Sequence, residues 1–196
     1  MLAELSPVIE LDRKLLLALN FDGGTLTDTI MWWLSDRAIW IPLYLVMGWL
    51  LWRKFGWRQM LLAVGVIVVA VVLSDQICNF FKHFTPKFRP SHTDAISDMV
   101  HTVNGYRGGL YGTVSAHAAT LTAIAVASSS LLRRLWWSII TGVWVAAVCY
   151  SRMYLGLHYP ADILLGIMLG ALLGYLAVIT FRAIVKRKPE TFNPHK

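Results

Sequence analysis

The stretch SRMYLGLHYPAD, residues 151–162, joins two apolar runs in the last third of the chain. It places three ionisable side chains, Arg152, His158 and Asp162, at the mouth of an expected membrane-spanning helix. Charged side chains are costly in hydrocarbon, so those found in or beside a span usually serve a function. This stretch is therefore both the turn between two expected helices and a candidate functional site.

The composition is typical of an integral membrane protein. Of 196 residues, 57% are hydrophobic and only 15% are charged, whereas soluble domains have roughly 25% charged residues. The nine Trp, seven Tyr and eight Phe residues fit aromatic belts at the two faces of a bilayer. The length suits a single membrane domain, 1–196, and we expect the bilayer as a partner and no nucleic acid.

Five apolar runs dominate the sequence, at residues 38–52, 60–81, 113–132, 136–150 and 161–181. A helical span needs roughly 20 apolar residues; the second, third and fifth runs reach that length, and the first and fourth fall short of it. In the fifth run, Gly166, Gly170 and Gly174 have the spacing of a close helix contact. The pattern predicts an all-α, polytopic membrane helix bundle with about five transmembrane helices over residues 38–186.

Residues 8–34 are expected to lie at the membrane interface. Residues 8–20 carry apolar positions at helical spacing interrupted by charges, which predicts an in-plane amphipathic helix. FDGGTLTD, residues 21–28, predicts a turn, and TIMWWLSDR, residues 29–37, a short half-buried helix.

Basic residues indicate how the chain is oriented. Nine of them follow the first, third and fifth runs, and so share one side of the membrane if all five runs span it: Arg53, Lys54, Arg58, Arg133, Arg134, Arg182, Lys186, Arg187 and Lys188. The positive-inside rule makes that side cytoplasmic. The polar segment 82–112 and the turn at 151–160 then share the other face. We therefore expect an active-site loop at 82–112 on the periplasmic or exterior side of a bacterial cytoplasmic membrane.

Three patches distant in the sequence meet at that face and together suit a phosphate. Arg89 and Arg152 offer planar guanidinium groups that match phosphate oxygens in pairs, and Lys82 adds a point charge. Ser115 and Ala116 stand at the start of the third run, where a helix N-terminus directs free N–H groups and a positive dipole end at an anion. We expect these five residues to hold the phosphate of a substrate.

Two histidines and an aspartate supply the chemistry. His158 and Asp162 are four residues apart, and so share one face of a helical first turn. The carboxylate can accept a hydrogen bond from one ring nitrogen and leave the other as a nucleophile. His117 is then placed to protonate the leaving oxygen as a general acid.

These patches resemble the signature of the type 2 phosphatidic acid phosphatase family, which includes bacterial lipid-phosphate and undecaprenyl-pyrophosphate phosphatases. KHFTPKFRP, residues 82–90, and SRMYLGLHYPAD fit its K-x6-RP and SR-x5-H-x3-D patterns. The middle patch, VSAH at residues 114–117, departs from the family's PSGH, with Val114 for proline and Ala116 for glycine. The Ala116 methyl group stands where the family's glycine would let phosphate approach closely. The backbone around Ala116 could therefore differ from that of the family.

The resemblance implies a phosphohistidine on His158 that water hydrolyses with His117 as the base, with no metal and no cofactor. It implies a lipid phosphate as the substrate, and an outward-facing site favours undecaprenyl pyrophosphate. The alternatives are a phosphatase of phosphatidic acid, phosphatidylglycerol phosphate or lipid A, or a lipid phosphotransferase. A small lipid transporter is the non-enzymatic alternative, but no internal repeat supports it. The oligomeric state is left open.

Further polar residues near the site have open roles. Lys87, Tyr106 and Arg107 are candidates for binding a headgroup or a second phosphate, and Asp75 lies inside an apolar run. Tyr154 is expected to pack in the interior. The loop histidines do not share the spacing of metal ligands, so we expect no metal site there.

Overall fold

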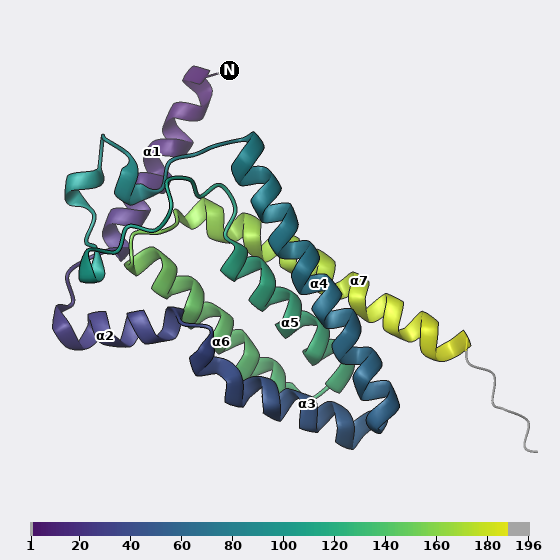
Figure 1. The fold of residues 1–196 in the computed structure, drawn as a ribbon. Helices are drawn as coiled ribbons and strands as arrows, with labels where there is room; N and C mark the ends of the chain where they lie inside the picture. The colour runs from purple at the N-terminus through teal and green to yellow at the C-terminus, as the bar shows by residue number, and fades with distance from the viewer. Residues whose placement is uncertain (1, 188–196) are drawn as a thin grey trace, which may run out of the picture.

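The computed structural model describes residues 2–187, with side chains described over 7–186. The helices of this part are α1 (Leu2–Leu19), α2 (Gly24–Ser35), α3 (Ile41–Phe55), α4 (Trp57–Phe84), α5 (Ala116–Leu132), α6 (Leu135–Tyr154) and α7 (Pro160–Arg187). Short 3₁₀ turns occupy Ala38–Trp40, Pro90–His92, Ser97–Met99 and Val103–Gly105. Figure 1 shows α3 to α7 gathered into one bundle, with α1 standing out from it. The predicted all-α class is confirmed.

Helix α5 is the centre of the bundle, and it packs against α4, α6 and α7. Its sequence is rich in Ala, Ser and Thr, and side chains on all of its faces are buried. Short side chains allow neighbouring helices to approach closely in a membrane, where tight packing rather than the hydrophobic effect holds helices together. The position of α5 therefore fixes the residues at its N-terminus relative to the helices around it.

Three glycines of α7 form the contact with α5, as their spacing predicts. A Cβ atom at Gly166 would come within 2.6 Å of the Ser115 carbonyl oxygen, and one at Gly174 within 2.6 Å of the Ala123 carbonyl oxygen. The two backbones touch directly because there is no side chain between them. This contact also brings the N-terminus of α7 beside that of α5.

The number of membrane spans is only partly settled by the helices themselves. By length and composition α4 and α7 can each cross a membrane, and α2 with residues 38–55 would make a third span, bent by 71° at its break. The third run is shorter than expected, because α5 begins at Ala116 and has 17 residues. Two or three spans are therefore supported directly, and the count of five stays a prediction.

Two expectations for the N-terminal region are wrong in detail. Helix α1 begins at Leu2 rather than at residue 8, and most of the expected turn at 21–28 is helical because α2 begins at Gly24. Polar residues there start a helix instead of breaking one. The Asp22 carboxylate accepts a hydrogen bond from the Gly24 N–H at 2.9 Å, which supports the first helical turn.

Six of the nine basic residues predicted to share one side gather at one end of the bundle. Two cavities at this end share Lys54 and are lined by Arg53, Lys54, Arg133, Arg134, Arg182 and Lys186. The Lys54 ammonium donates to the carbonyl oxygens of Leu131 and Leu132 at 2.8 and 2.7 Å. It thereby satisfies acceptors at the C-terminus of α5. The Arg187 side chain and Lys188 lie outside the described residues.

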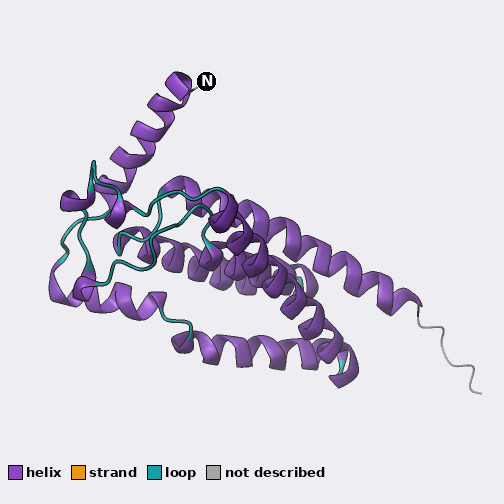
Figure 2. Cartoon of the chain, turned by 45° about the horizontal axis from the view of Figure 1, so that its top comes forward, coloured by secondary structure: helices purple, strands orange, loops and turns teal. Residues whose placement is uncertain are grey.

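The long loop between α4 and α5 covers the opposite end, where the irregular segments gather (Figure 2). The predicted loop at 82–112 starts slightly later, because α4 runs to Phe84. Phe88 and Tyr111 form an isolated antiparallel bridge between its two arms. Asn20, at the end of α1, accepts a hydrogen bond from the His101 N–H at 2.7 Å and donates to the His101 carbonyl at 3.0 Å. The loop is thus fixed over the helix ends.

Candidate active site

His158 lies in the short turn between α6 and α7 and is 2% exposed. Its Nδ1 is 3.5 Å from Oδ2 of Asp162, which also accepts the Tyr159 N–H at 3.0 Å. Asp162 sits in the first turn of α7, so the four-residue spacing places the carboxylate beside the ring, as the sequence predicts. Nδ1 makes no hydrogen bond within the described residues, but it is the ring nitrogen that lies beside the carboxylate, which leaves Nε2 as the candidate nucleophile.

A lysine from the loop holds the other oxygen of Asp162. The Lys87 ammonium is 2.8 Å from Oδ1 of Asp162 and 3.4 Å from Oδ2 of Asp12 on α1. Asp12 in turn accepts the Ala161 N–H at 2.9 Å, at the start of α7. Lys87 also lies over the Tyr159 ring, 4.2 Å from its centroid. Lys87 is therefore bound to the carboxylate of the site, not free for a headgroup, and Asp12 is a contact that the sequence analysis missed.

Two arginines of the site come from different segments, Arg89 from the long loop and Arg152 from the last turn of α6. Arg89 is fixed by hydrogen bonds from Nε to the Tyr111 carbonyl at 3.2 Å and from Nη1 to the Leu157 carbonyl at 3.1 Å. Arg152 is 8% exposed, and its Nη1 donates to the Ser35 hydroxyl. The Nε of Arg152 is buried without a partner among the described residues. A buried, unpaired N–H of a cation is costly, and an anionic ligand would satisfy it.

The second patch forms the N-terminus of α5. Ser115 is the N-cap residue, and its hydroxyl accepts the Ala118 N–H at 3.4 Å. Its own N–H donates to the Asp162 carbonyl at 3.1 Å, so the N-termini of α5 and α7 lie side by side. The Ala116 methyl group is buried in an apolar cluster with Cys78 and Val114. The departure from the family's glycine is therefore accommodated by the interior of the bundle.

Lys82 lies in the last turn of α4, at the edge of the site. Its ammonium is 3.5 Å from the Asn79 side-chain oxygen, and the Asn79 amide donates to Asp75 at 3.0 Å. Asp75, whose role the sequence leaves open, therefore lies near Lys82 through one intervening side chain. The half-buried Lys82 side chain is long enough to turn toward an anion in the site.

Positive charges from the first and third patches act on His158. Its burial, and then the positive charges of Arg89, Arg152, Lys82 and Lys87, hold the pKa of His158 well below its usual range. Burial and nearby cations both disfavour the imidazolium form, so the ring stays neutral at neutral pH. A neutral imidazole has the free lone pair that a nucleophile needs.

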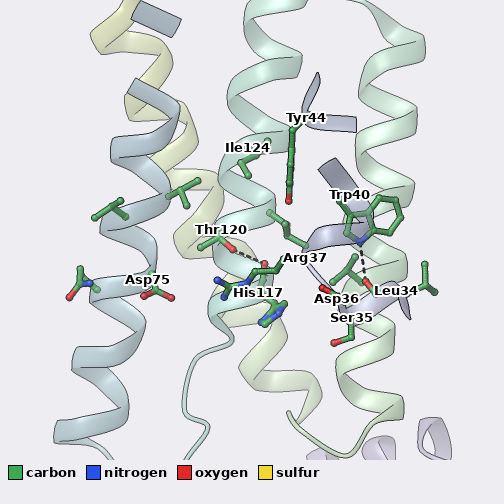
Figure 3. Close-up of a pocket in the computed structure, with 15 residues that line it drawn as sticks. Leu34, Ser35, Asp36, Arg37, Trp40, Tyr44, Asp75, His117, Thr120 and Ile124 are labelled. Atoms are coloured by element: carbon green, nitrogen blue, oxygen red, sulfur yellow. Dashed lines mark hydrogen bonds between the residues drawn. The ribbon is translucent and has the colours of Figure 1, made fainter. Parts of the chain in front are cut away.

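His117, in the first turn of α5, is half-buried and lines two cavities. One, of about 260 Å³, is largely apolar and runs past Tyr44, Val72 and Ile124 between α3, α4 and α5. Figure 3 shows His117, Arg37 and Asp36 near one end of it, and Tyr44 and Ile124 further along. The other cavity, of about 420 Å³, holds His117 together with Arg152 and more polar groups.

Other candidates from the sequence have structural roles. Tyr154 is fully buried, and its hydroxyl donates to Asp28 at 2.6 Å, which ties α6 to α2. His101 Nε2 lies 2.9 Å from the same carboxylate. The Arg107 guanidinium donates to the Ser91 carbonyl within the loop. Of the residues with open roles, Asp75 lines the first cavity with His117, and Tyr106 lines the second cavity with His117 and Arg152.

A helical membrane bundle with a buried histidine among four cations defines a class of membrane enzymes that act on phosphate groups. The model of the PAP2 superfamily matches residues 59–186, and the chain belongs to this superfamily. It is accordingly an integral membrane lipid phosphatase. The resemblance noted in the sequence is confirmed.

Two relatives and two solved structures resemble this chain. A lipid A 4'-phosphatase of Bacteroides thetaiotaomicron is 36% identical over 169 residues, 85% of this chain and 75% of the relative. A lipid A 4'-phosphatase of Porphyromonas gingivalis is 34% identical over 169 residues, 86% of this chain and 72% of the relative. The PAP2-type phosphatidylglycerolphosphate phosphatase of Bacillus subtilis has the same fold, with a TM-score of 0.67, 20% identity and coverage of 93% and 90%. Aquifex aeolicus LpxE matches with a TM-score of 0.65, 20% identity and coverage of 85% and 93%.

Proposed function

We propose that this lipid phosphatase removes a phosphate ester from the sugar headgroup of a lipid A-type glycolipid. The observation that carries this proposal is the place of His117 between a largely apolar cavity and a polar one. A substrate with its phosphate at that junction has room for apolar chain on one side and for a polar group on the other. The two relatives that are more than a third identical act on such a lipid by their names.

The residues of the site suit a two-step mechanism. The phosphate lies between Arg89, Arg152 and Lys82, whose charges stabilise the transition state. Nε2 of His158 attacks phosphorus, the bond from phosphorus to the sugar oxygen breaks, and His117 donates a proton to that oxygen. His117 then takes a proton from water, which attacks the phosphohistidine and releases inorganic phosphate. Asp162 keeps the His158 ring in the reactive tautomer throughout.

The sequence analysis favoured undecaprenyl pyrophosphate, and the relatives support the alternative instead. Both are phosphatases of lipid A, which carries monoester phosphates on a sugar. The residues that contact phosphate are the same for either substrate, so the three patches do not distinguish them. Selectivity must come from residues around the phosphate site.

We also propose that α3 to α7 each cross the bilayer, with the basic end in the cytoplasm and His158 at the outer face. The gathering of the basic side chains at the opposite end from the site supports this orientation. α5, though short, is surrounded by other helices and does not need to meet lipid along its whole length.

The substrate proposal is tested by phosphate release from purified protein in detergent, with EDTA present because we expect no metal. Lipid A with a 4'-phosphate should be hydrolysed faster than undecaprenyl pyrophosphate or phosphatidic acid at equal concentration. His158→Ala should abolish release, whereas His83→Ala, at an exposed position on α4, should not change it. Faster hydrolysis of undecaprenyl pyrophosphate would overturn the proposed substrate. Full release by His158→Ala would remove the nucleophile.

A further inference from the structure

The polar cavity beside His117 has a wall that belongs to none of the three phosphate patches. Besides His117, Arg152 and Leu155, which belong to two of those patches, residues of α2, of its C-terminal break and of the long loop line this cavity of about 420 Å³: Trp32, Ser35, Asp36, Arg37 and Tyr106. Its volume lies in the range of small-molecule sites. The cavity starts at the catalytic histidine, so it is the space into which the group bearing the phosphate extends.

Two aromatic rings form one side of this wall. Trp32 and Tyr106 meet edge to face, with ring centroids 5.5 Å apart and an interplanar angle of 86°. Both remain accessible, at 36% and 47% exposure. Trp32 comes from α2 and Tyr106 from the long loop, so the contact between their rings connects these two segments at the cavity. The face of an aromatic ring is apolar but carries a partial negative charge. It therefore attracts the weakly positive C–H groups of a sugar ring.

Hydrogen-bonding groups stand next to the aromatic pair. The Arg37 guanidinium makes no ion pair with any acid in the described part of the chain. One oxygen of Asp36 accepts the Ala38 N–H at 2.9 Å, which leaves the other oxygen free to accept from a ligand. Hydroxyl and amide groups around the edge of a sugar ring need such donors and acceptors, whereas a hydrocarbon chain does not.

The cavity wall is also tied to the phosphate site. Arg152 donates a hydrogen bond to Ser35, the last residue of α2, so the guanidinium that faces the phosphate also fixes the break that carries Asp36 and Arg37. A sugar ring in the cavity would therefore be held at a defined distance from the phosphate. This coupling favours a rigid headgroup over a flexible one, since a rigid ring loses less freedom on binding.

We propose that Trp32, Tyr106, Asp36 and Arg37 form a sugar-binding subsite for the ring that carries the scissile phosphate. This inference rests on the proposed function, because it names the part of the protein that selects a phosphorylated sugar over other lipid phosphates. Trp32 and Tyr106 pack against the ring, while Asp36 and Arg37 bind its polar edge.

The test is a selectivity ratio, kcat/KM for lipid A 4'-phosphate divided by kcat/KM for phosphatidic acid, which has no sugar. Trp32→Ala and Tyr106→Ala should each lower this ratio about 10-fold, the effect of losing one aromatic contact. Trp32→Phe should keep most of it. Trp33→Ala is the matched control, because Trp33 is the next residue of the same helix, is 56% exposed and does not line the cavity. The selectivity ratio of this variant should equal that of the wild type.

A ratio has the advantage that a loss of folded protein lowers both rates together and leaves it unchanged. An unchanged ratio in Trp32→Ala and Tyr106→Ala would overturn the subsite while leaving the lipid phosphatase intact. A fall of the same size in Trp33→Ala would also overturn it. Wild-type protein that hydrolyses phosphatidic acid but not lipid A would instead overturn the proposed substrate, and the subsite with it.

Discussion

The Lys87 ammonium lies between two carboxylates, Asp12 and Asp162, each 75 residues away in the sequence. It is 2.8 Å from the Asp162 carboxylate, which in turn lies beside His158, the proposed nucleophile. Groups behind a reactive side chain fix its orientation and charge, and their loss often costs one to two orders of magnitude in activity. We therefore propose Lys87 as a positioning residue, with Asp12 as its contact on α1.

We predict that Lys87→Met lowers kcat about 10-fold while KM changes little, because a small misplacement of a nucleophile is costly. Lys87 is also one of the cations that depress the pKa of His158. Its loss raises that pKa, so protonation inactivates the ring at higher pH and the acid limb of the rate profile moves upward.

Two variants complete this experiment. Lys87→Arg keeps the charge and should retain most of kcat with the acid limb in place. Lys14→Met, at an exposed lysine paired only with Glu10 on α1, is the matched control and should resemble wild type. An unchanged pH profile in Lys87→Met would argue for a purely structural role.

Among the helices, the contact of α5 with α7 positions the site most directly. Both helices begin at the site, and the Ser115 N–H to Asp162 carbonyl bond joins their first turns. The glycines below that bond let the two backbones touch for several turns. The pair thus acts as a rigid support, with His117 on one helix and Asp162 on the other.

We predict that Gly170→Ala destabilises the protein by about 1–3 kcal/mol, the usual cost of overpacking a tight interior. Its Cβ would lie 2.9 Å from the carbonyl carbon of Ala119 and 2.9 Å from Cβ of Thr122, so the helices must separate. The measurement is the midpoint of thermal unfolding in detergent. Gly65→Ala, in α4, meets no atom within 4 Å and serves as the control. An equal midpoint for the two variants would contradict the role of the contact.

The whole molecule has two chemically different ends. One carries the phosphate site and the long loop, and the other carries a cluster of arginines and lysines. In a bilayer such a distribution sets the orientation, since cytoplasmic loops retain basic residues. This distribution supports the proposed orientation, in which the site opens on the side away from the cytoplasm.

We predict that Met99→Cys reacts with a membrane-impermeant thiol reagent on intact spheroplasts, and that Leu135→Cys reacts only after permeabilisation. Met99 is 59% exposed in the long loop and Leu135 is 78% exposed at the basic end. The native thiols, Cys78 and Cys149, are 0% and 5% exposed and should contribute little background. The reverse labelling pattern would place the site in the cytoplasm.

Much of this arrangement follows from local features of the sequence. Apolar runs predict the helices, because a side chain facing lipid or a packed interior must be apolar wherever it lies. The motif residues predict the phosphate site, and the four-residue separation of His158 and Asp162 predicts that they lie close together, although His158 is in the turn just before α7. Helix starts were predicted less well, since Asp22 and its polar neighbours support a helix in one context and a turn in another.

The sequence by itself determined the membrane class and the main helices, and it predicted the histidines, cations and carboxylate of the proposed phosphate site. Only the tertiary structure decided that Lys87 lies between Asp12 and Asp162, that the Ala116 methyl group faces the interior, and that Trp32 and Arg37 line the space beside His117. The physical reason is the separation of residues along the chain. Periodicity and motifs give information about residues that lie within a turn or two of one another. Contacts between segments that are far apart in the chain depend on how helices pack, and packing is a property of the whole bundle.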